Sequence, residues 1–408
     1  LEPYPTSLRG INWIKFISYL SSSQPPIYSN SQIHTLSSSL YAQYKILLDN
    51  LEYHLLGNHI LENGFSLLFG AFYFKDEELY KKAYEIITEQ LQKQILDDGG
   101  HFELSPMYHQ IILDRLLDCI NLLQNNQIFV DQDQLLNLKT EKAVKMLAWL
   151  NRMTLPNGQI PLLNDSAPDI APRTKQINDY ASRLNLICTN SFHSWSLSES
   201  GYRRRNGSNY ECIIDIGPIG PSYQPGHAHA DTFNFVLNTY NNPFIIDTGI
   251  STYENNNQRL WERSTPAHNT VTINNKNSSQ VWSAFRVGKR AHVEVLKEDK
   301  NDILDKHNGF KKTFHYRQWS FYENRIQIFD TLEGKYLKGK AHLWLNPNIE
   351  PELKNNEVVC HGNRISFENY DEINILKMKI PEGYNQYTYT HKIEISFSKF
   401  LKTKIIIN

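Results

Sequence analysis

The sequence predicts an α+β protein of two domains, in which a helical N-terminal half precedes an antiparallel β-sandwich. Apolar residues recur three and four positions apart from about residue 8 to residue 186, as they do in amphipathic helices. After about residue 189 this period gives way to short β-rich segments bounded by Gly, Asn, Asp or Pro. Many strands and few helices favour packed antiparallel sheets. We place the boundary between residues 186 and 198, which gives domains of residues 1–190 and 191–408.

The helical half is divided by three stretches with turn chemistry, at residues 21–26, 97–100 and 155–158. Helices of this length joined by short loops indicate pairs that stack side by side. The sequence shows no fixed-period repeat, so its pattern does not indicate a solenoid.

The second half contains several candidate strands. They lie at residues 211–216, 232–237, 270–273, 292–296, 325–329 and 393–397. We expect these strands to pair in antiparallel sheets.

Composition limits the classes of protein and of binding partner that are compatible with this chain. A chain of 408 residues with 40% hydrophobic content is long enough for two cores. Its net charge of −1 argues against nucleic acid as the main partner, because phosphate binding favours a basic surplus. No stretch of apolar residues is long enough for a transmembrane helix, and the four cysteines, which form no CxxC pair, are expected to be buried free thiols.

Residues 226–231, Gly-His-Ala-His-Ala-Asp, form a motif whose side chains could bind a ligand or take part in catalysis. In an extended strand His227, His229 and Asp231 project from one face and the alanines from the other. Such a polar row is costly to bury unless it binds something, so a metal or a polar substrate is the expected occupant. Isolated histidines in strands are usually hydrogen-bonded structural residues, and the spacing alone does not decide between these interpretations.

Two later residues strengthen the case for a site. Asp247 ends the apolar run at residues 244–246, and His268 precedes the alternating run at residues 270–273. Both therefore lie at strand ends, where sites are commonly built. Either histidine of the first motif together with Asp247 and His268 would supply the three ligands of an open zinc site.

The strings GHAHADTFNF, IIDTG and RSTPAHNTV resemble the heparinase II/III family of polysaccharide lyases, whose relatives include alginate and oligoalginate lyases. The resemblance covers nearly the whole chain and implies an incomplete α/α toroid followed by an antiparallel β-sandwich. It also implies a structural zinc held by His229, Asp247 and His268, with His227 beside the substrate. Family members often have further helices before this region, so we expect the native chain to begin upstream of Leu1.

A polar run at residues 52–63 interrupts an otherwise apolar helix pattern. Asn58 and Glu62 are one turn apart and share a face, with Asn63 near them. From the residues alone, a structural polar cluster is an equal alternative to a site. The resemblance implies that Asn58 and His59 face the carboxylate of the substrate.

The string Ser-Pro-Met-Tyr-His places a tyrosine at a helix start. Ser105 is a good N-cap and Pro106 a good first helical residue, so Tyr108 is expected in the first turn. The positive end of the helix dipole favours a phenolate there. A tyrosine that only packs on the preceding loop is the alternative. The string matches the catalytic tyrosine of the family, which implies that role for Tyr108.

These elements predict a lyase that cleaves a uronic-acid glycan by β-elimination. Tyr108 is the expected acid and, in a syn elimination, also the base, whereas His227 is the base when proton and leaving group lie on opposite faces. Asn58 and His59 would neutralise the uronate carboxylate.

Several further expectations concern ligands and partners. Arg259 and Arg263 are expected to bind substrate as cations, Tyr253 to contact a sugar, and Asp231 to orient an imidazole. Zinc is expected to align His227 rather than to attack the substrate. The partner is expected to be an anionic polysaccharide, with a homodimer left open, in the periplasm or outside the cell, or alternatively in the cytoplasm. A zinc hydrolase and a non-catalytic glycan-binding protein are the rival interpretations.

Overall fold

The computed structural model describes residues 2–22, 27–186 and 196–408, which form two compact units. The described residues of the first unit are 2–22, 27–99, 111–147 and 176–186, and those of the second are 100–110, 148–175 and 196–408. The expected domain boundary falls largely on residues 187–195, which lie outside the described residues together with Cys188. Residues 100–110 and 148–175 come from the helical half of the sequence but belong to the second unit, so Tyr108 and His227 share one unit.

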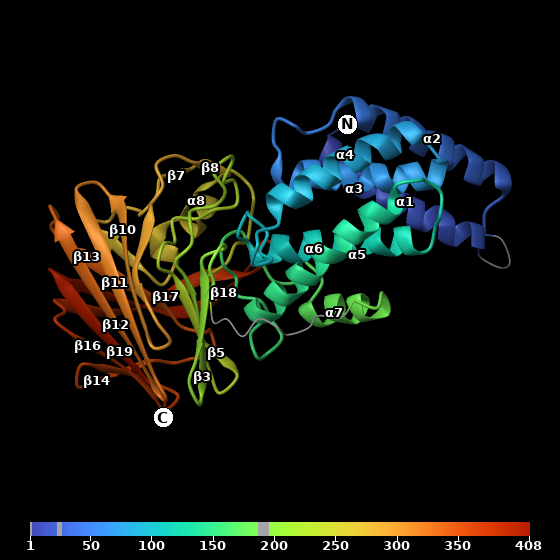
Figure 1. Ribbon diagram of the computed structural model, residues 1–408. Coiled ribbons are helices and arrows are strands. Elements are labelled where there is room, and N and C mark those ends of the chain that lie inside the picture. Colours follow the sequence, from blue (N-terminus) through green and yellow to red (C-terminus); the bar gives the residue numbers. More distant parts are fainter. Residues whose placement is uncertain (1, 23–26, 187–195) are drawn as a thin grey trace. The chain divides into compact units, whose positions relative to one another are not determined.

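The helical half of the sequence is confirmed as helical (Figure 1). Its helices are α1 (Pro3–Ser22), α2 (Asn30–Asp49), α3 (Gly57–Phe74), α4 (Glu77–Gln94), α5 (Pro106–Gln124), α6 (Gln132–Met153) and α7 (Thr174–Arg183). The expected breaks at residues 97–100 and 155–158 separate α4 from α5 and α6 from α7. None of the helices in the described part of the chain is long and apolar enough to cross a membrane.

Helix α3 is the buried centre of the first unit. Nearly all of its side chains are buried, in keeping with its apolar composition. Two glycines permit close packing, because a Cβ atom at Gly64 would lie 2.8 Å from Ile86 and one at Gly70 would lie 2.7 Å from the ring of Tyr44. Substitution of either glycine would therefore force neighbouring side chains apart.

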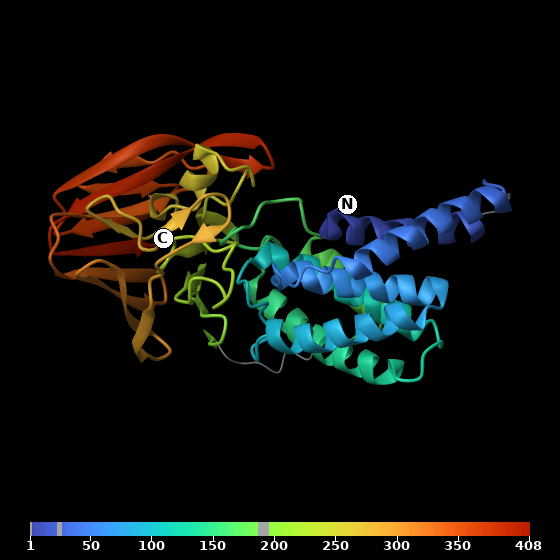
Figure 2. The ribbon, with the colours of Figure 1, turned by 90° about the horizontal axis from the view of Figure 1, so that it is seen from above.

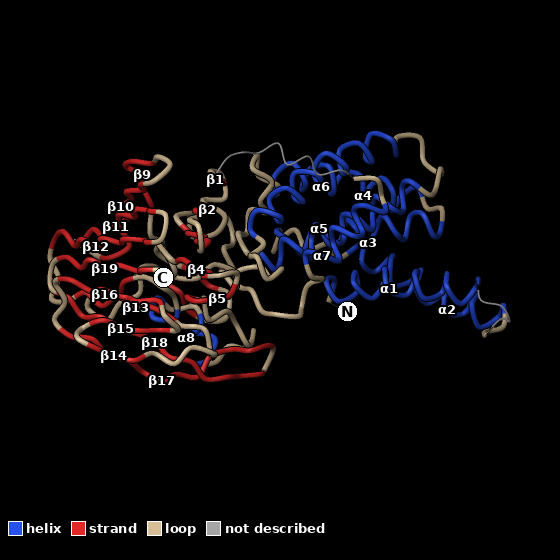
Figure 3. The backbone as a smooth tube through the Cα atoms, turned by 90° about the horizontal axis from the view of Figure 1, so that it is seen from below, coloured by secondary structure: helices blue, strands red, loops and turns tan. Residues whose placement is uncertain are grey.

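The strands lie in the second half of the sequence, as expected (Figure 3). Strands β1 to β5 are Ser196–Leu197, Tyr202–Asn206, Tyr210–Asp215, Phe235–Thr239 and Asn242–Ile245, and helix α8 (Asn257–Glu262) and the 3₁₀ turn η1 (Thr265–Ala267) follow them. Strands β6 to β12 are Val271–Ile273, Val281–Trp282, Arg286–Val287, Val293–Glu298, Asp302–Phe310, Thr313–Tyr322 and Arg325–Gly334. Strands β13 to β19 are Gly339–Trp344, Glu352–Lys354, Glu357–Cys360, Asn363–Glu368, Glu372–Gly383, Gln386–Phe397 and Phe400–Ile406.

Within the described residues, these strands form antiparallel sheets of five, eight, four and two strands. The order is β1-β2-β3-β4-β5 in the first, β14-β15-β16-β19-β12-β11-β10-β9 in the second, β17-β18-β13-β6 in the third and β7-β8 in the fourth. The strands of the C-terminal part run side by side in Figure 2, where they are orange and red. One hydrophobic cluster takes side chains from the three larger sheets, for example Phe235 from β4, Ile328 from β12 and Ile395 from β18.

Most of the strand predictions are confirmed, with small shifts of their ends. The expected strand at residues 232–237 begins only at Phe235, and residues 226–231 form a turn and loop. Three cysteines, Cys119, Cys212 and Cys360, are buried free thiols, as the sequence predicted.

Candidate functional site

The loop at residues 226–231 carries the histidines of the site, and its expected strand conformation is wrong. Its backbone groups pair with other loops instead of a strand ladder: Asp165 N donates to His227 O over 3.2 Å, and Ala230 N donates to Arg263 O over 3.0 Å. The Arg263 guanidinium also donates to Ala228 O over 2.9 Å. These hydrogen bonds hold the loop in place. They also pair backbone N–H and C=O groups that would pair with a neighbouring strand if the loop were a strand.

A single carboxylate, Asp165, connects three side chains of the site. Its Oδ2 lies 2.9 Å from His227 Nδ1, and its Oδ1 lies 2.7 Å from His229 Nε2. Arg259 donates to the same two oxygens over 2.5 and 2.6 Å. Burial alone would raise the pKa of Asp165, but the charge of Arg259 and the hydrogen bonds from both histidines hold it well below its usual range. Asp165 is therefore an ionised acceptor.

The protonation of His227 follows from this contact. An ionised carboxylate only accepts, so the neutral imidazole carries its proton on Nδ1 and presents Nε2 as a proton acceptor. The His227 side chain is 11% exposed. Glu103 Oε2 lies 3.9 Å from Nε2. The geometry suits a general base.

Tyr108 lies against His227. Helix α5 begins at Pro106, and Ser105 Oγ accepts a hydrogen bond from Tyr108 N over 3.4 Å, as the predicted capping requires. The tyrosine and histidine rings stack with their centroids 3.8 Å apart and an interplanar angle of 29°. The Tyr108 hydroxyl donates to the Tyr253 hydroxyl over 3.2 Å. The structure thus brings together three residues that the sequence singled out separately.

The predicted metal ligands form a second, fully buried cluster. His268 Nδ1 lies 2.8 Å from Asp247 Oδ2, and the rings of His229 and His268 have centroids 5.2 Å apart. Asp247 also accepts from Asn234 Nδ2 over 2.5 Å and from the backbone N of Gly249 over 2.9 Å. Burial lowers the pKa of His229 to about 3, so this imidazole is neutral and able to act as a ligand.

The donor set agrees with zinc chemistry in type. Within the described part of the chain, His229 Nδ1, His268 Nε2 and Asp231 Oδ2 are buried and have no hydrogen-bond partner. Two imidazole nitrogens with carboxylate oxygens nearby are the atoms that zinc prefers. Across residues 2–22, 27–186 and 196–408, however, no three His, Cys, Asp or Glu side chains converge closely enough to hold a metal ion. The residues fit zinc in their chemistry.

Arg259 and Arg263 differ from the expectation that they bind substrate as cations. Both side chains are 0% exposed. Arg259 is engaged by Asp165 and by the backbone oxygen of Ala284, to which its Nε donates over 3.0 Å. Arg263 donates to the oxygens of Ala228, Ser283 and Ala284. The two guanidiniums connect the loops of the site through these hydrogen bonds. A buried cation needs such partners to be stable.

Asn58 and His59 lie in the first turn of α3, in the first unit. Asn58 is 4% exposed, and the His59 side chain is 35% exposed with its Nδ1 3.1 Å from Glu52 Oε1. The residue before the helix, Leu56, makes no side-chain capping bond. Backbone N–H groups at such a helix start, with the adjoining amide and imidazole, favour an anion.

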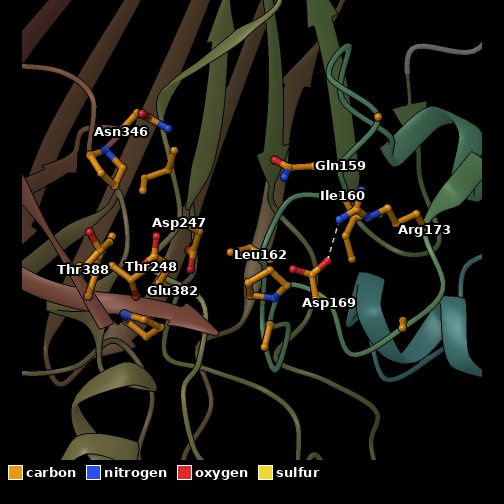
Figure 4. A pocket seen from close by; sticks show the side chains of 18 of the residues that line it. Gln159, Ile160, Leu162, Asp169, Arg173, Asp247, Thr248, Asn346, Glu382 and Thr388 are labelled. Carbon is orange, nitrogen blue, oxygen red and sulfur yellow. Dashed lines mark hydrogen bonds and ion pairs between the residues drawn. The ribbon is translucent and has the colours of Figure 1, made fainter. Parts of the chain in front are cut away.

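A cavity of about 390 Å³ adjoins the metal-ligand cluster (Figure 4). Asp247 and Thr248 form part of its wall, and Asp169 and Arg173 lie across it, joined by an ion pair of 3.1 Å. Neither Tyr108 nor His227 is among the described residues that line it. Neither side chain of the Tyr108–His227 pair therefore contributes to the wall of this cavity.

Sequence reasoning missed Asp165. The residue lies in the polar run Asn164-Asp165-Ser166, between Leu163 and Ala167, in a segment that reads as a loop. All three polar side chains are nevertheless at most 4% exposed. Buried polar residues between apolar ones were the available signal, but the side-chain partners of Asp165 are distant in sequence: His227 lies 62 positions away and Arg259 lies 94 positions away.

Two family models together match almost the whole chain. A family model described as heparinase II/III N-terminus matches residues 12–189, and one described as heparinase II/III-like, C-terminal matches residues 189–406. A heparin-sulfate lyase of Bacteroides stercoris is 23% identical over 318 residues, which cover 71% of this chain and 46% of that protein. The chain thus spans about half the length of this relative.

Solved structures show the same fold. Heparinase III superposes with a TM-score of 0.81 at 18% sequence identity, over 100% of this chain and 69% of the other. A heparan sulfate lyase from Pedobacter heparinus superposes with a TM-score of 0.71 at 19% identity, over 99% and 68%. At these identities the likeness establishes the fold alone.

Proposed function

Because the chain belongs to the heparinase II/III family, we propose that it is a polysaccharide lyase that cleaves a uronic-acid-containing glycan by β-elimination. The observation that carries this proposal is the stacking of Tyr108 on His227, with ring centroids 3.8 Å apart. A proton donor and a proton acceptor held side by side are what the elimination needs.

In the proposed reaction, a base removes the proton from C5, beside the uronate carboxylate. The C–H electron pair forms the C4–C5 double bond, and the C4–O bond breaks with its electrons leaving on the oxygen. His227 takes the proton at Nε2 when proton and leaving oxygen lie on opposite faces of the ring, and the Tyr108 hydroxyl protonates the oxygen. In a syn elimination Tyr108 performs both transfers. Such acid–base assistance typically contributes roughly 10²- to 10⁴-fold.

The buried carboxylate of Asp165 supports this assignment. It accepts from Nδ1 of His227 and so leaves Nε2 as the proton acceptor. Asn58 and His59 are proposed to neutralise the uronate carboxylate, whose charge opposes the developing enolate. Preorganised donors of this kind are worth about 3 kcal/mol each.

We propose zinc as a structural cofactor held by His229, Asp247 and His268. The buried, neutral imidazole of His229, with its open Nδ1, supports this assignment. When bound, zinc would fix the loop that carries His227 relative to the segments that carry Asp247 and His268. On the same family likeness, we propose that the helices form an incomplete α/α toroid and the sheets an antiparallel β-sandwich.

The test is incubation of the purified protein with a panel of uronic-acid polysaccharides: heparan sulfate, hyaluronan, alginate and bacterial capsules. Each elimination creates a C4–C5 double bond conjugated with the carboxylate, so ultraviolet absorbance should rise with at least one substrate. New reducing ends without that absorbance would instead indicate hydrolysis and overturn the proposal.

A further inference from the structure

Three aromatic side chains from distant parts of the sequence form a row that begins at His227. Phe285, in the hairpin of β7 and β8, lies 6.2 Å from His227 between ring centroids, with the rings almost perpendicular at 87°. Tyr253 stacks on Phe285 at 5.9 Å and 17°, and Tyr384, at the tip of the β17–β18 hairpin, follows Tyr253 at 6.2 Å and 34°. We call Phe285, Tyr253 and Tyr384 the aromatic ledge.

Two of the three ledge rings are exposed to solvent, and Tyr253 between them is half-buried. Phe285 is 44% exposed and Tyr384 is 46% exposed. Single exposed aromatic residues are common, but three neighbouring rings beside a reactive pair form a contiguous surface, and such surfaces often mark binding sites. The ledge is therefore a candidate surface for a ligand that reaches His227.

Contacts with neighbouring residues hold the rings of the ledge in place. Asn385 N donates to Ser251 O over 2.8 Å, and Ser251 Oγ donates to the Tyr387 hydroxyl over 3.0 Å, which ties the β17–β18 hairpin to the segment before Tyr253. Arg259 lies 5.4 Å from the centroid of the Tyr253 ring and 5.3 Å from that of Phe285. A preorganised surface of this kind loses little entropy when it binds.

From this geometry we infer that the aromatic ledge stacks against the pyranose rings that flank the bond to be cleaved. The C–H groups on one face of a pyranose carry partial positive charge, and the face of an aromatic ring is negative, so the two attract while both leave water. Successive ledge rings lie 5.9 and 6.2 Å apart, which is close enough for one glycan to contact more than one of them. The inference rests on the proposed function and adds Phe285 and Tyr384 as binding residues.

If the ledge binds sugar rings, the effect of losing one ring should depend on the length of the glycan. A long glycan covers all of its rings, whereas the shortest oligosaccharide that is still cleaved contacts fewer of them. Loss of Tyr384, the ring farthest along the row from His227, should therefore matter for the polymer and little for that oligosaccharide.

The experiment compares Phe285→Ala and Tyr384→Ala with Tyr389→Ala, a control on β18 of the same hairpin whose side chain is 60% exposed. We expect KM for the polymer to rise roughly 3- to 10-fold in the two ledge variants, with kcat changing less and Tyr389→Ala unaffected. Phe285→Tyr and Tyr384→Phe should restore the wild-type KM, because they keep a ring. Unchanged KM values in both alanine variants, or an equal rise in Tyr389→Ala, would overturn the inference.

A binding measurement separates this inference from the lyase assignment. The same ledge substitutions are placed in Tyr108→Phe, and affinity gel electrophoresis measures retention by each polysaccharide of the panel. Retention that weakens with loss of the rings supports the ledge even if no glycan is cleaved. Cleavage without ring dependence refutes the ledge alone, and retention by none of the glycans refutes it as well.

Discussion

The carboxylate of Asp165 lies 2.9 Å from Nδ1 of His227, so a fully buried acid sets the proton position on the proposed base. The same carboxylate binds His229 and Arg259. One side chain therefore links the Tyr108–His227 pair to the metal-ligand cluster, and removing its charge should affect both.

The first prediction concerns Asp165→Asn. An amide cannot accept from both imidazoles and the guanidinium, so the proton on Nδ1 of His227 is no longer fixed and kcat should fall roughly 10²-fold or more. The buried Arg259 also loses its counter-charge, which should cost about 3 kcal/mol of unfolding free energy. Turnover is measured on protein whose fold is checked by circular dichroism.

Two variants separate these effects. Asp169→Asn removes a carboxylate that is 75% exposed and pairs with Arg173, so it should change neither turnover nor stability appreciably. His227→Ala should lose turnover while keeping the Asp165–Arg259 pair and most of the stability. Activity of Asp165→Asn within threefold of wild type would remove Asp165 from the mechanism.

The second prediction concerns Tyr108→Phe. The substitution removes the proton that the leaving oxygen needs, so turnover should fall to background, while the ring still stacks on His227 and the melting temperature stays nearly unchanged. Tyr253→Phe removes only the hydroxyl that accepts from Tyr108, and its loss should be below about tenfold. If Tyr108→Phe retained near-normal activity, another residue would have to be the acid.

The order of elements and most strands could be predicted because they follow local periodicity. Residues 226–231 could not, because the alternation of His and Ala mimics a strand while long-range bonds decide the conformation. Ala228 O and Ala230 N are both paired with Arg263, thirty-five and thirty-three positions along the chain. A pattern of period two is therefore necessary for a strand but does not ensure one.

The functional site, like the fold, could be predicted from the sequence only in part. The side chains proposed to react and to bind zinc were predicted from motifs that resemble those of the family, and the capping chemistry of Ser105 placed Tyr108 correctly in the first turn of α5. Asp165 and Phe285 could not be identified, since each acts through partners distant in sequence. Arg259 and Arg263 looked like free cations because sequence does not reveal a buried counter-charge or carbonyl.

The third prediction concerns His229→Ala. If His229 is a zinc ligand, the purified variant should lose most of its metal and part of its thermal stability together, because metal binding stabilises only the folded state. Metal content is measured by atomic emission, and melting temperature with and without a chelator. His34→Ala, an exposed histidine on α2, is the matched control.

Metal content also distinguishes the two candidate carboxylate ligands, Asp247 and Asp231. Asp247→Asn should lose metal as His229→Ala does, whereas Asp231→Asn should retain it if Asp231 only supports an imidazole. Full zinc occupancy in His229→Ala would show that the ligand assignment is incorrect, and loss of metal in Asp231→Asn alone would assign the third position to Asp231.

The fourth prediction concerns pH and Asp305, on β10, far in sequence from the reactive residues. Its side chain is 0% exposed, and neither carboxylate oxygen has a hydrogen-bond partner among the described residues. Burial raises the pKa of Asp305 to about 7, although Arg203 and Arg205 act in the opposite direction. The folded state therefore binds a proton that the unfolded state releases at lower pH.

The sign of the pH effect follows from this proton. Between the ordinary pKa of an aspartate, about 4, and about 7, the folded state holds more protons, so this group's contribution to stability falls as pH rises and levels off above pH 7. Asp305→Asn keeps the shape and lacks the charge, so its melting temperature should exceed that of wild type at pH 8 by a few degrees, and the difference should shrink towards pH 5. Asp131→Asn, at an exposed position, should show no such pH-dependent difference. Equal melting temperatures of Asp305→Asn and wild type at pH 8 would mean that the Asp305 charge is already compensated by Arg203 and Arg205.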